Sequence, residues 1–426
     1  MDEGSAFGPE SGPGGKAYLE YLDRLGKAVG HRDRVEPLRS YLTGLVLPGE
    51  RKTLEPIAGR LDPDHVSRRH QSLHHFVNEA PWSDEAVLRV ARQEVLGLMG
   101  RIGGLVAWSV GEVRQPKKGE SSVGVDRQPL SPSGPSANCQ VSVQVSLVNE
   151  SISLPAAWHL FLPQSWTQPG QRRESARVPP EVGFRTREEI ALDAIEGLLR
   201  EGVPRAPVIA PTPYGSNPSF RSRLTERGFS YVVGVPPWTR VVAVEAPKLP
   251  VFPGPSGTRL RWPWRRRSAR GPRSALELAC MLPASAWSTQ SWTEGDRGTR
   301  QSRFAVWPVR SGSRARRGAR KGSREGLLIE WPEGNGTPWN FWLSTVGESG
   351  AMADLVRLAK LPWRVQQDHV ELSQEFGLTH FEGRSWRGFH HHASLSIAAY
   401  AFWASRRVER SAVGPNPAAA PSPTAT

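Results

Sequence analysis

The fold is decided by a helix–strand–helix–strand stretch, EEIALDAIEGLLREGVPRAPVIAPTPYGSNPSFRSRLTERGFSYVVGV, which covers residues 188–235. Apolar residues recur at helical spacing from residue 188 to about residue 201, and the short run PVIAP that follows is typical of a buried strand. The helix SFRSRLTERG and the strand YVVGV repeat this order. Strands that alternate with helices indicate an α/β sheet with helical crossovers.

Three further strands are predicted before this stretch. GGLVAWSVGEV begins at Gly103 and is a short apolar run bounded by glycines. CQVSVQVSLVN, residues 139–149, alternates with period two, and AAWHLFLP covers residues 156–163. We therefore expect a mixed sheet in which antiparallel strands come first and helical crossovers follow.

The segments on either side of this sheet differ in character. Apolar residues at helical spacing predict several helices before residue 101, the last of them with Ser83 as its N-cap. Short β segments rich in Pro and Trp follow residue 235, and helices close the fold. The expected organisation is a disordered start (1–16), a helical region (17–100), the first part of the core (101–235), a β-rich basic insertion (236–350), C-terminal core helices (351–411) and a disordered tail (412–426).

The composition excludes several classes of protein. The chain has 426 residues, enough for two to three domains, and its two cysteines, Cys139 and Cys280, cannot build a disulfide framework or a four-thiolate zinc site. No apolar run reaches the roughly 18 residues that span a bilayer. The N-terminus has no basic segment followed by an apolar one, so it is not a signal peptide. We expect a cytoplasmic protein that makes no membrane contact.

The positive charge is concentrated in one segment. Residues 259–324 contain 17 Lys and Arg and three acids, which accounts for the whole net charge of +14. A basic stretch with Gly, Pro and Ser either follows a phosphate backbone or is a solvated loop without a partner. The interleaved Trp262 and Trp264 either stack on bases or pack under a loop.

Eight segments in series resemble the DDE-type transposases of bacterial insertion sequences, in particular the insertion sequence 701 group. They include PKKGESSVGVDRQ, NCQVSVQVSLVN, LLIEWPEG and GLTHFEGRSWRGFHHHASLSIAAYAF, and together they run from about residue 41 to residue 402. The resemblance implies an α/β, ribonuclease-H-like mixed sheet core with a β-rich insertion and an N-terminal helical domain that recognises DNA ends. It also implies double-stranded DNA at transposon ends as the partner, with a homodimer as one assembly on that DNA.

The resemblance implies a chemistry that needs two divalent cations, Mg²⁺ in the family, held by two aspartates and a glutamate. Matched segment by segment, the first aspartate falls on Gly111 in AWSVGEVRQPKKG and the second on Pro211 in VIAPTPYG. The glutamate falls on Gln366 in PWRVQQDHVELS. Glu112 is a candidate substitute, although adjacent strand residues point to opposite faces, and a paired or solvated surface acid is the alternative. We therefore expect no intact catalytic acid and no metal cofactor in this chain.

Other polar residues near these positions favour structural roles. At about 100° per residue, Asp368 and Glu371 lie about 200° and 140° round the helix from Gln366, which favours a solvated helix surface for both. The three histidines at 390–392 cannot all face one ion. We expect them to start a helix or to contact the DNA backbone.

Three functions remain open from the sequence: an active DNA-cutting and joining enzyme, a non-catalytic DNA-binding protein, and the product of a decaying gene. The first has the family's segments but lacks the acids, the second keeps DNA recognition, and drift would explain the third. The residues expected to contact DNA are Lys117, Lys118, Arg259, Arg261, Arg265, Arg266, Arg267, Arg314, Arg316, Arg317, Arg320 and Lys321.

Replacing Arg265, Arg266 and Arg267 together by alanine should weaken DNA binding about equally for all sequences, because phosphate contacts carry no sequence information. Each lost phosphate contact should also reduce the slope of log affinity against log salt by about 0.9. Fluorescence anisotropy over a salt series measures both. A salt slope that is flat in the unmodified protein would show that this segment is not the DNA-binding surface.

Overall fold

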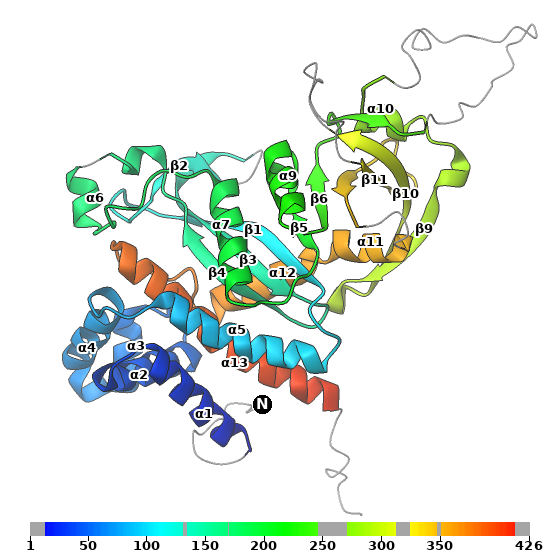
Figure 1. Ribbon diagram of the computed structural model, residues 1–426. Helices are drawn as coiled ribbons and strands as arrows, with labels where there is room; N and C mark the ends of the chain where they lie inside the picture. The colour runs from blue at the N-terminus through cyan, green and yellow to red at the C-terminus, as the bar shows by residue number, and fades with distance from the viewer. Residues whose placement is uncertain are drawn as a thin grey trace, which may run out of the picture. The chain divides into compact units, whose positions relative to one another are not determined.

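The computed structural model describes residues 13–130, 134–168, 170–245, 271–311, 324–346 and 351–413. The chain packs into two compact units (coloured by residue number in Figure 1). The first unit contains residues up to 105, residues 112–190 and residues from 365 onward, and the second contains 106–111 and 191–364. Most of the residues for which disorder is predicted, 1–12 and 414–426, lie outside the described residues.

The N-terminal part of the first unit is helical, as predicted. α5 begins after Ser83, whose hydroxyl accepts a hydrogen bond from the backbone N–H of Ala86 and so caps the helix. α13 runs beside α5 (Figure 1), and the Tyr21 hydroxyl of α1 donates to the Ala398 carbonyl of α13 at 2.8 Å. The helices are α1 (Pro13–Ala28), α2 (Val35–Val46), α3 (Leu54–Leu61), α4 (Val66–Asn78), α5 (Asp84–Arg101) and α13 (Trp386–Val413).

The strands that lie wholly in the first unit pair antiparallel. β3 pairs with β4 from Ser142 opposite Leu160 to Val148 opposite Ser153, and β2 pairs with the first part of β3. β3 is buried on both faces from Cys139 onward, and α5 and α13 pack against β4. The elements are β2 (Asp126–Pro129), β3 (Ser136–Val148), β4 (Ser153–Leu160), α6 (Gln171–Ser175) and α12 (Pro362–Gln374), which begins in the second unit.

The parallel part of the core joins three strands through helical crossovers. β1 (Ala107–Pro116) starts in the second unit, and its last residues belong to the first. β5 (Val208–Ala210) is parallel to β1, and β6 (Tyr231–Val235) is parallel to β5. Parallel neighbours need a long connection, and here α7 (Arg187–Arg200) precedes β5 while α8 (Thr212–Gly215) and α9 (Pro218–Glu226) lie between β5 and β6. Every residue of β5 and β6 is buried, which explains their continuous apolar sequences.

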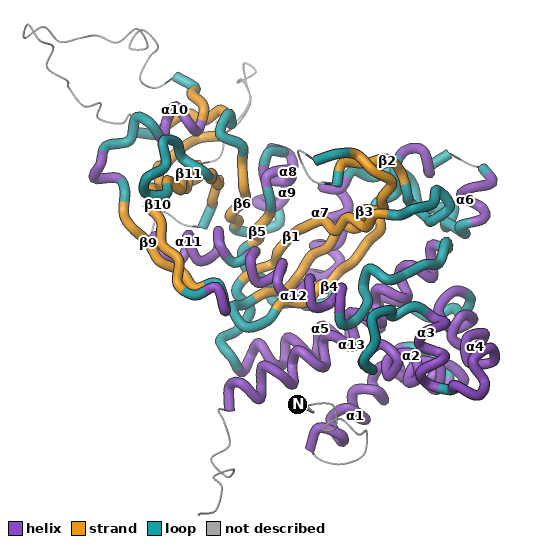
Figure 2. Tube along the Cα trace, turned by 180° about the vertical axis from the view of Figure 1, so that it is seen from behind, coloured by secondary structure: helices purple, strands orange, loops and turns teal. Residues whose placement is uncertain are grey.

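The β-rich insertion continues the core sheet beyond β6. β12 pairs antiparallel with β6, with Phe341 opposite Val235, and β11, β10, β7 and β8 follow in order across a sheet of 12 strands. β9 pairs with β10, and α11 packs against β9 and β6 (Figure 2). The elements are β7 (Arg240–Ala243), β8 (Arg273–Ser274), α10 (Ala275–Ala279), β9 (Ser288–Thr293), β10 (Thr299–Ser311), β11 (Arg324–Trp331), β12 (Asn340–Ser344) and α11 (Met352–Lys360).

The predicted fold class is confirmed: an α/β mixed sheet is followed by a β-rich insertion that ends before the last core helices. The sequence pattern missed β2 and β9, because both are short, polar and largely exposed strands. α13 also begins earlier than its apolar run SLSIAAYAF indicates. It starts at Trp386, and the hydroxyl of the preceding Ser385 accepts a hydrogen bond from the Gly388 N–H in the first turn at 3.1 Å.

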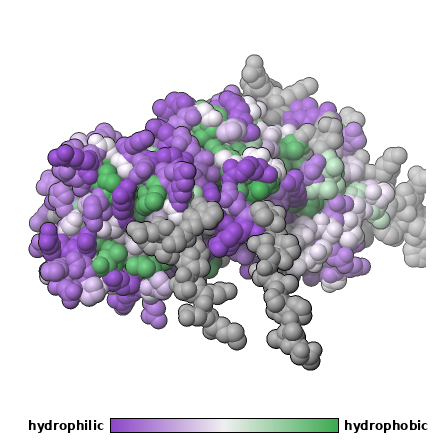
Figure 3. All heavy atoms as spheres, turned by 90° about the horizontal axis from the view of Figure 1, so that it is seen from below, coloured by the Kyte–Doolittle hydropathy of each residue, from purple (hydrophilic) through white to green (hydrophobic). Residues whose placement is uncertain are grey.

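Apolar residues are mostly inside the two units. On the face seen from below, hydrophobic side chains form small separate patches among hydrophilic ones (Figure 3). Among the described helices, none combines the length and the hydropathy needed to cross a bilayer.

A buried ion pair joins a core crossover helix to the insertion. The guanidinium of Arg221, on α9, donates to the Glu325 carboxylate of β11 at 3.2 Å, and their side chains are 7% and 0% exposed. The Tyr231 hydroxyl donates to the same carboxylate at 2.6 Å, and Ser311 also donates to it. Burial, and then the charge of Glu325, raise the pKa of Tyr231 far above its ordinary value, so its hydroxyl stays a donor.

Arg221→Ala should lower the free energy of unfolding by about 3–5 kcal/mol, because it leaves a buried carboxylate without its counterion. The double variant Arg221→Met/Glu325→Leu should recover only part of that loss: the apolar pair needs no desolvation, but the Tyr231 and Ser311 hydroxyls lose their buried acceptor. Urea denaturation measures both. Lys16→Ala, which removes an exposed i,i+4 pair with Glu20, is the matched control and should change little. A loss below about 1 kcal/mol for Arg221→Ala would contradict this role.

Candidate active site

The positions predicted for the first two acids lie at one level of the sheet. β1 and β5 are parallel, with Trp108 opposite Val208 and Ser109 opposite Ile209. Continued by two residues, this register sets Gly111 beside Pro211 on strands about 4.8 Å apart. Ligands of α/β sheets bind outside the carboxyl ends of such strands. β1 itself runs on to Pro116, so Gly111 lies within its strand and not at the end of it.

The turn after β5 is tightly packed and has no carboxylate side chain. Pro211 is the N-cap of α8, its side chain caps nothing, and its carbonyl accepts the N–H groups of Tyr214 and Gly215 at 3.1 Å each. A side chain on Gly215 would collide with β6, because its Cβ would lie 1.9 Å from the Gly234 carbonyl oxygen. The turn is therefore packed directly onto β6, and the position predicted for the second acid is an exposed proline.

Glu112, the candidate substitute, is engaged by two cations. Its carboxylate accepts a hydrogen bond from Arg114 at 2.7 Å and another from Arg187 at 3.3 Å, and the Glu112 side chain is only 10% exposed. Arg187 also donates to the Gln128 side chain at 2.9 Å. One carboxylate thus lies between two guanidinium groups, which is the paired alternative considered from the sequence. A dication approaching it would meet a local excess of positive charge.

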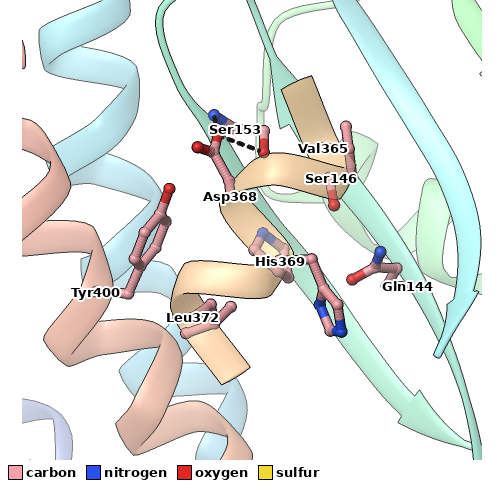
Figure 4. A pocket seen from close by; sticks show the side chains of 9 residues that line it. Gln144, Ser146, Ser153, Val365, Asp368, His369, Leu372 and Tyr400 are labelled. Atoms are coloured by element: carbon pink, nitrogen blue, oxygen red, sulfur yellow. Dashed lines mark hydrogen bonds between the residues drawn. The ribbon is translucent and has the colours of Figure 1, made fainter. Parts of the chain in front are cut away.

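Gln366 lies on the exposed side of α12, in the other compact unit from Gly111 and Pro211. Its convergence with those two positions therefore stays a prediction. The sequence prediction for Asp368 was wrong: this residue is 2% exposed, and its carboxylate accepts the Ser153 N–H at 2.6 Å and the Ser153 hydroxyl at 2.8 Å (Figure 4). The helical angle correctly placed Gln366 and Asp368 on different faces of α12, but the buried face is the one that carries Asp368. Glu371 is partly buried and pairs with Arg407.

A small cavity lies on the buried face of α12. It has room for about one water molecule and is lined mainly by polar residues of β3, β4 and α12, with Tyr400 of α13 on one side (Figure 4). Burial lowers the pKa of His369 in its wall to about 4, so the ring is neutral at neutral pH. The Asp368 carboxylate in this cavity already accepts two hydrogen bonds from Ser153, and Gln366 lies on the other side of the helix. The cavity is therefore separate from the predicted acid positions.

The three consecutive histidines are structural. All are buried in α13, where they are 8%, 3% and 2% exposed, which excludes the alternative of a contact to the DNA backbone. Each ring has different hydrogen-bond partners, so the three histidines connect α13 to several other parts of the chain. The His390 ring accepts a hydrogen bond from the Leu160 N–H and contacts the Trp386 carbonyl. The His391 ring contacts the Val77 and Trp82 carbonyls. The His392 ring contacts the Tyr41 hydroxyl and the Gly377 carbonyl.

Two of the residues expected to bind DNA can be placed. The Lys117 ammonium donates to the Phe381 carbonyl at 2.7 Å, and burial lowers its pKa. Lys118 is exposed. The others, at 259–267 and 314–321, lie outside the described residues.

The residues at the predicted metal positions do not fit a pair of Mg²⁺ ions. Glycine and proline offer no side-chain oxygen, and glutamine offers a neutral one, whereas hard cations need carboxylates. Within the described ranges, no group of three His, Cys, Asp or Glu is arranged to hold a metal ion. The missing carboxylates could be predicted from the sequence, because Gly, Pro and Gln are read directly in the segments that resemble the family.

Comparison with known proteins identifies the family. Residues 24–299 match the family model of the DDE superfamily endonucleases, a region that includes β1, β5 and β6. A curated relative, "Probable transposase for insertion sequence element IS701" of Microchaete diplosiphon, is 30% identical over 193 residues, which are 45% of this chain and 46% of the relative. The chain therefore matches about half the length of that relative. Because the family model covers more than half of the chain and agrees with the sheet and its crossovers, this chain belongs to the DDE superfamily endonucleases, as its resemblance to insertion-sequence transposases predicted.

Proposed function

We propose that this chain is a transposase-family protein for insertion-sequence DNA that binds DNA but does not cut or join it. The observation that carries the proposal is that Gly111, Pro211 and Gln366, the positions to which the family resemblance assigns the metal-binding acids, all lack a carboxylate. In a two-metal site, carboxylates bring the negative charge that holds two dications close together. A single neutral residue weakens such a site, whereas three remove its charge.

The charged residues next to Gly111 also disfavour a metal site. Glu112 is the acid adjacent to Gly111, and its carboxylate is shared by Arg114 and Arg187. To serve as a metal ligand, Glu112 would have to leave both guanidinium groups with their charges half-buried and unpaired, which costs free energy. Its present partners are the more stable arrangement.

DNA binding is the part of the family's function that this proposal keeps. The segment 259–324 carries the whole net positive charge of the chain, and such a charge gives affinity for phosphate backbones. The N-terminal helices would then recognise transposon ends in double-stranded DNA. Neither role requires the three acids.

A second candidate is a DNA-binding protein recruited to another task. The core next to the predicted acid positions favours it over simple decay, since Trp108, Val208, Ile209 and Val233 are large or branched apolar residues and are at most 1% exposed. Random drift would replace such residues as readily as the acids. Binding to any DNA without preference for the element's ends would favour recruitment over the first candidate.

The unmodified protein should shift a duplex that carries the element's own ends in a gel, yet leave it uncut with Mg²⁺ or Mn²⁺. The triple variant Gly111→Asp/Pro211→Asp/Gln366→Glu should gain a rise in melting temperature with Mn²⁺, because a ligand that binds only the folded state stabilises it by about 2.7 kcal/mol at 100 times its Kd. Each single reversion, the matched control, should show no such rise. Cleavage by the unmodified protein would refute the proposal.

Glu112→Gln should lower the free energy of unfolding by about 1–3 kcal/mol, because it removes the charge partner of Arg114 and Arg187. The loss should be the same with and without Mn²⁺ if Glu112 is only an ion-pair partner. Thermal denaturation measures it, with Glu120→Gln, at an exposed acid nearby, as the control. A loss that appears only in the presence of Mn²⁺ would instead show that Glu112 is a ligand.

A further inference from the structure

Lys360, the last residue of α11, places a charged group inside the second unit. Its side chain is 15% exposed, and its ammonium donates to the Glu330 carboxylate at 2.7 Å. Three aromatic rings lie around the same ammonium, with the ring centre of Trp292 at 4.4 Å and those of Phe304 and Trp342 at 5.6 Å. Each distance is within the roughly 6 Å over which a ring face attracts a cation. The three aromatic residues and Glu330 together form the ammonium cage.

Strand register places the whole ammonium cage on one face of the sheet. Residues that are opposite each other, or two apart on one strand, point to the same face. Phe304 of β10 is opposite Glu330 of β11, which is opposite the residue two before Trp342 on β12. Trp292 of β9 is opposite Arg300, four residues before Phe304. Because α11 packs against β9 (Figure 2), the end of one helix reaches all four side chains.

The walls of the cage are also held by contacts that do not involve Lys360. The Glu330 carboxylate accepts a hydrogen bond from the Asn340 amide at 2.7 Å. The Trp292 indole N–H donates to Glu294 at 2.8 Å, and its ring meets the ring of Phe304 edge to face, with the centroids 5.8 Å apart. A site that is held in shape by its own contacts loses less entropy when it takes up a ligand. The cage is therefore built as a receptor for a cation.

Lys360 lies at the joint between α11 and α12. The next residue, Leu361, has helical backbone angles, and its N–H donates to the Arg357 carbonyl at 2.9 Å. α12 begins directly after it, at Pro362. α11 has only 9 residues, and a helix of that length is marginal in water by itself. The contact of Lys360 with the cage therefore helps to hold α11 and the start of α12 in the second unit.

We propose that the ammonium cage is a binding site for a primary alkylammonium ion, and that its ligand in the folded chain is the protein's own Lys360. Ring faces attract the cation without fixing its direction, and the carboxylate supplies a charge-assisted hydrogen bond. An ammonium that leaves the cage regains its hydration, so α11 is a strap that can be released from the sheet. A released strap opens the cage to another alkylammonium ion. This inference goes beyond the proposed function and involves no DNA.

The first test measures hydrogen exchange of the α11 amides by mass spectrometry. Lys360→Met keeps the aliphatic stem but removes the charge, and it should speed this exchange about 10- to 100-fold, because a desolvated cation loses both its rings and its carboxylate. The α5 amides in the other unit are the internal reference and should not change. Lys27→Met, at an exposed lysine in the last turn of α1, is the matched control. Unchanged exchange in α11 of Lys360→Met would overturn the inference.

The second test fills the vacated cage from solution. Lys360→Ala should be stabilised by propylammonium chloride, with a folded-to-unfolded ratio about 10-fold higher at about ten times the Kd of this ion. Sodium chloride at the same ionic strength should not have this effect. The unmodified protein, whose cage holds Lys360, should respond equally to both salts, and so should Lys360→Ala/Glu330→Gln, whose cage lacks the carboxylate. Urea denaturation measures all three proteins.

Each outcome bears on the cage alone. Equal responses of Lys360→Ala to the two salts would show that the site does not recognise an ammonium ion. A preference for propylammonium that survives Glu330→Gln, or that the unmodified protein shares, would place the binding elsewhere on the chain and also overturn the inference. If Lys360→Ala does not fold, the exchange of α11 in Lys360→Met decides.

Discussion

The parallel pairing of β1, β5 and β6 is the constraint on which this structure depends. Trp108 is opposite Val208, and Val208 is opposite Tyr231. Residues that lie equally far along the three strands are therefore neighbours across the sheet. The turn after β5 is held against β6 by the close approach of Gly215 to Gly234. β12 then pairs with β6 in the opposite direction, which brings the insertion to the same end.

The fold and the chemistry of this end are supported by different residues. Every residue of β5 and β6 is buried, whereas Pro211 and Gln366 are exposed. Burial of an aliphatic side chain contributes about 1.5–3 kcal/mol, whereas a surface carboxylate contributes little to folding. A DDE superfamily endonuclease can therefore keep its sheet, its crossovers and its insertion after the acids are replaced. Beside Gly111, two guanidinium groups, those of Arg114 and Arg187, surround the single carboxylate of Glu112.

Much of the fold could be predicted from the sequence, because its main elements have strong hydrophobic patterns. The apolar run YVVGV and the capped helix after Ser83 are examples, and both form as expected. β9 could not be predicted, since its exposed polar residues carry no such pattern. For Asp368, helical angles showed that it faces away from Gln366 but not which face is buried, and only the contact with Ser153 decides that.

We propose that the carboxyl end of this sheet does not hold divalent cations. It is tested most directly by X-ray diffraction from crystals soaked in Mn²⁺, with anomalous difference maps that locate each ion independently of any model of the site. We expect no anomalous peak within coordination distance, about 2.0–2.6 Å, of oxygen atoms at Gly111, Glu112, Pro211 or Gln366. A pair of peaks there about 4 Å apart, with the Glu112 carboxylate turned away from Arg114 and Arg187, would contradict it.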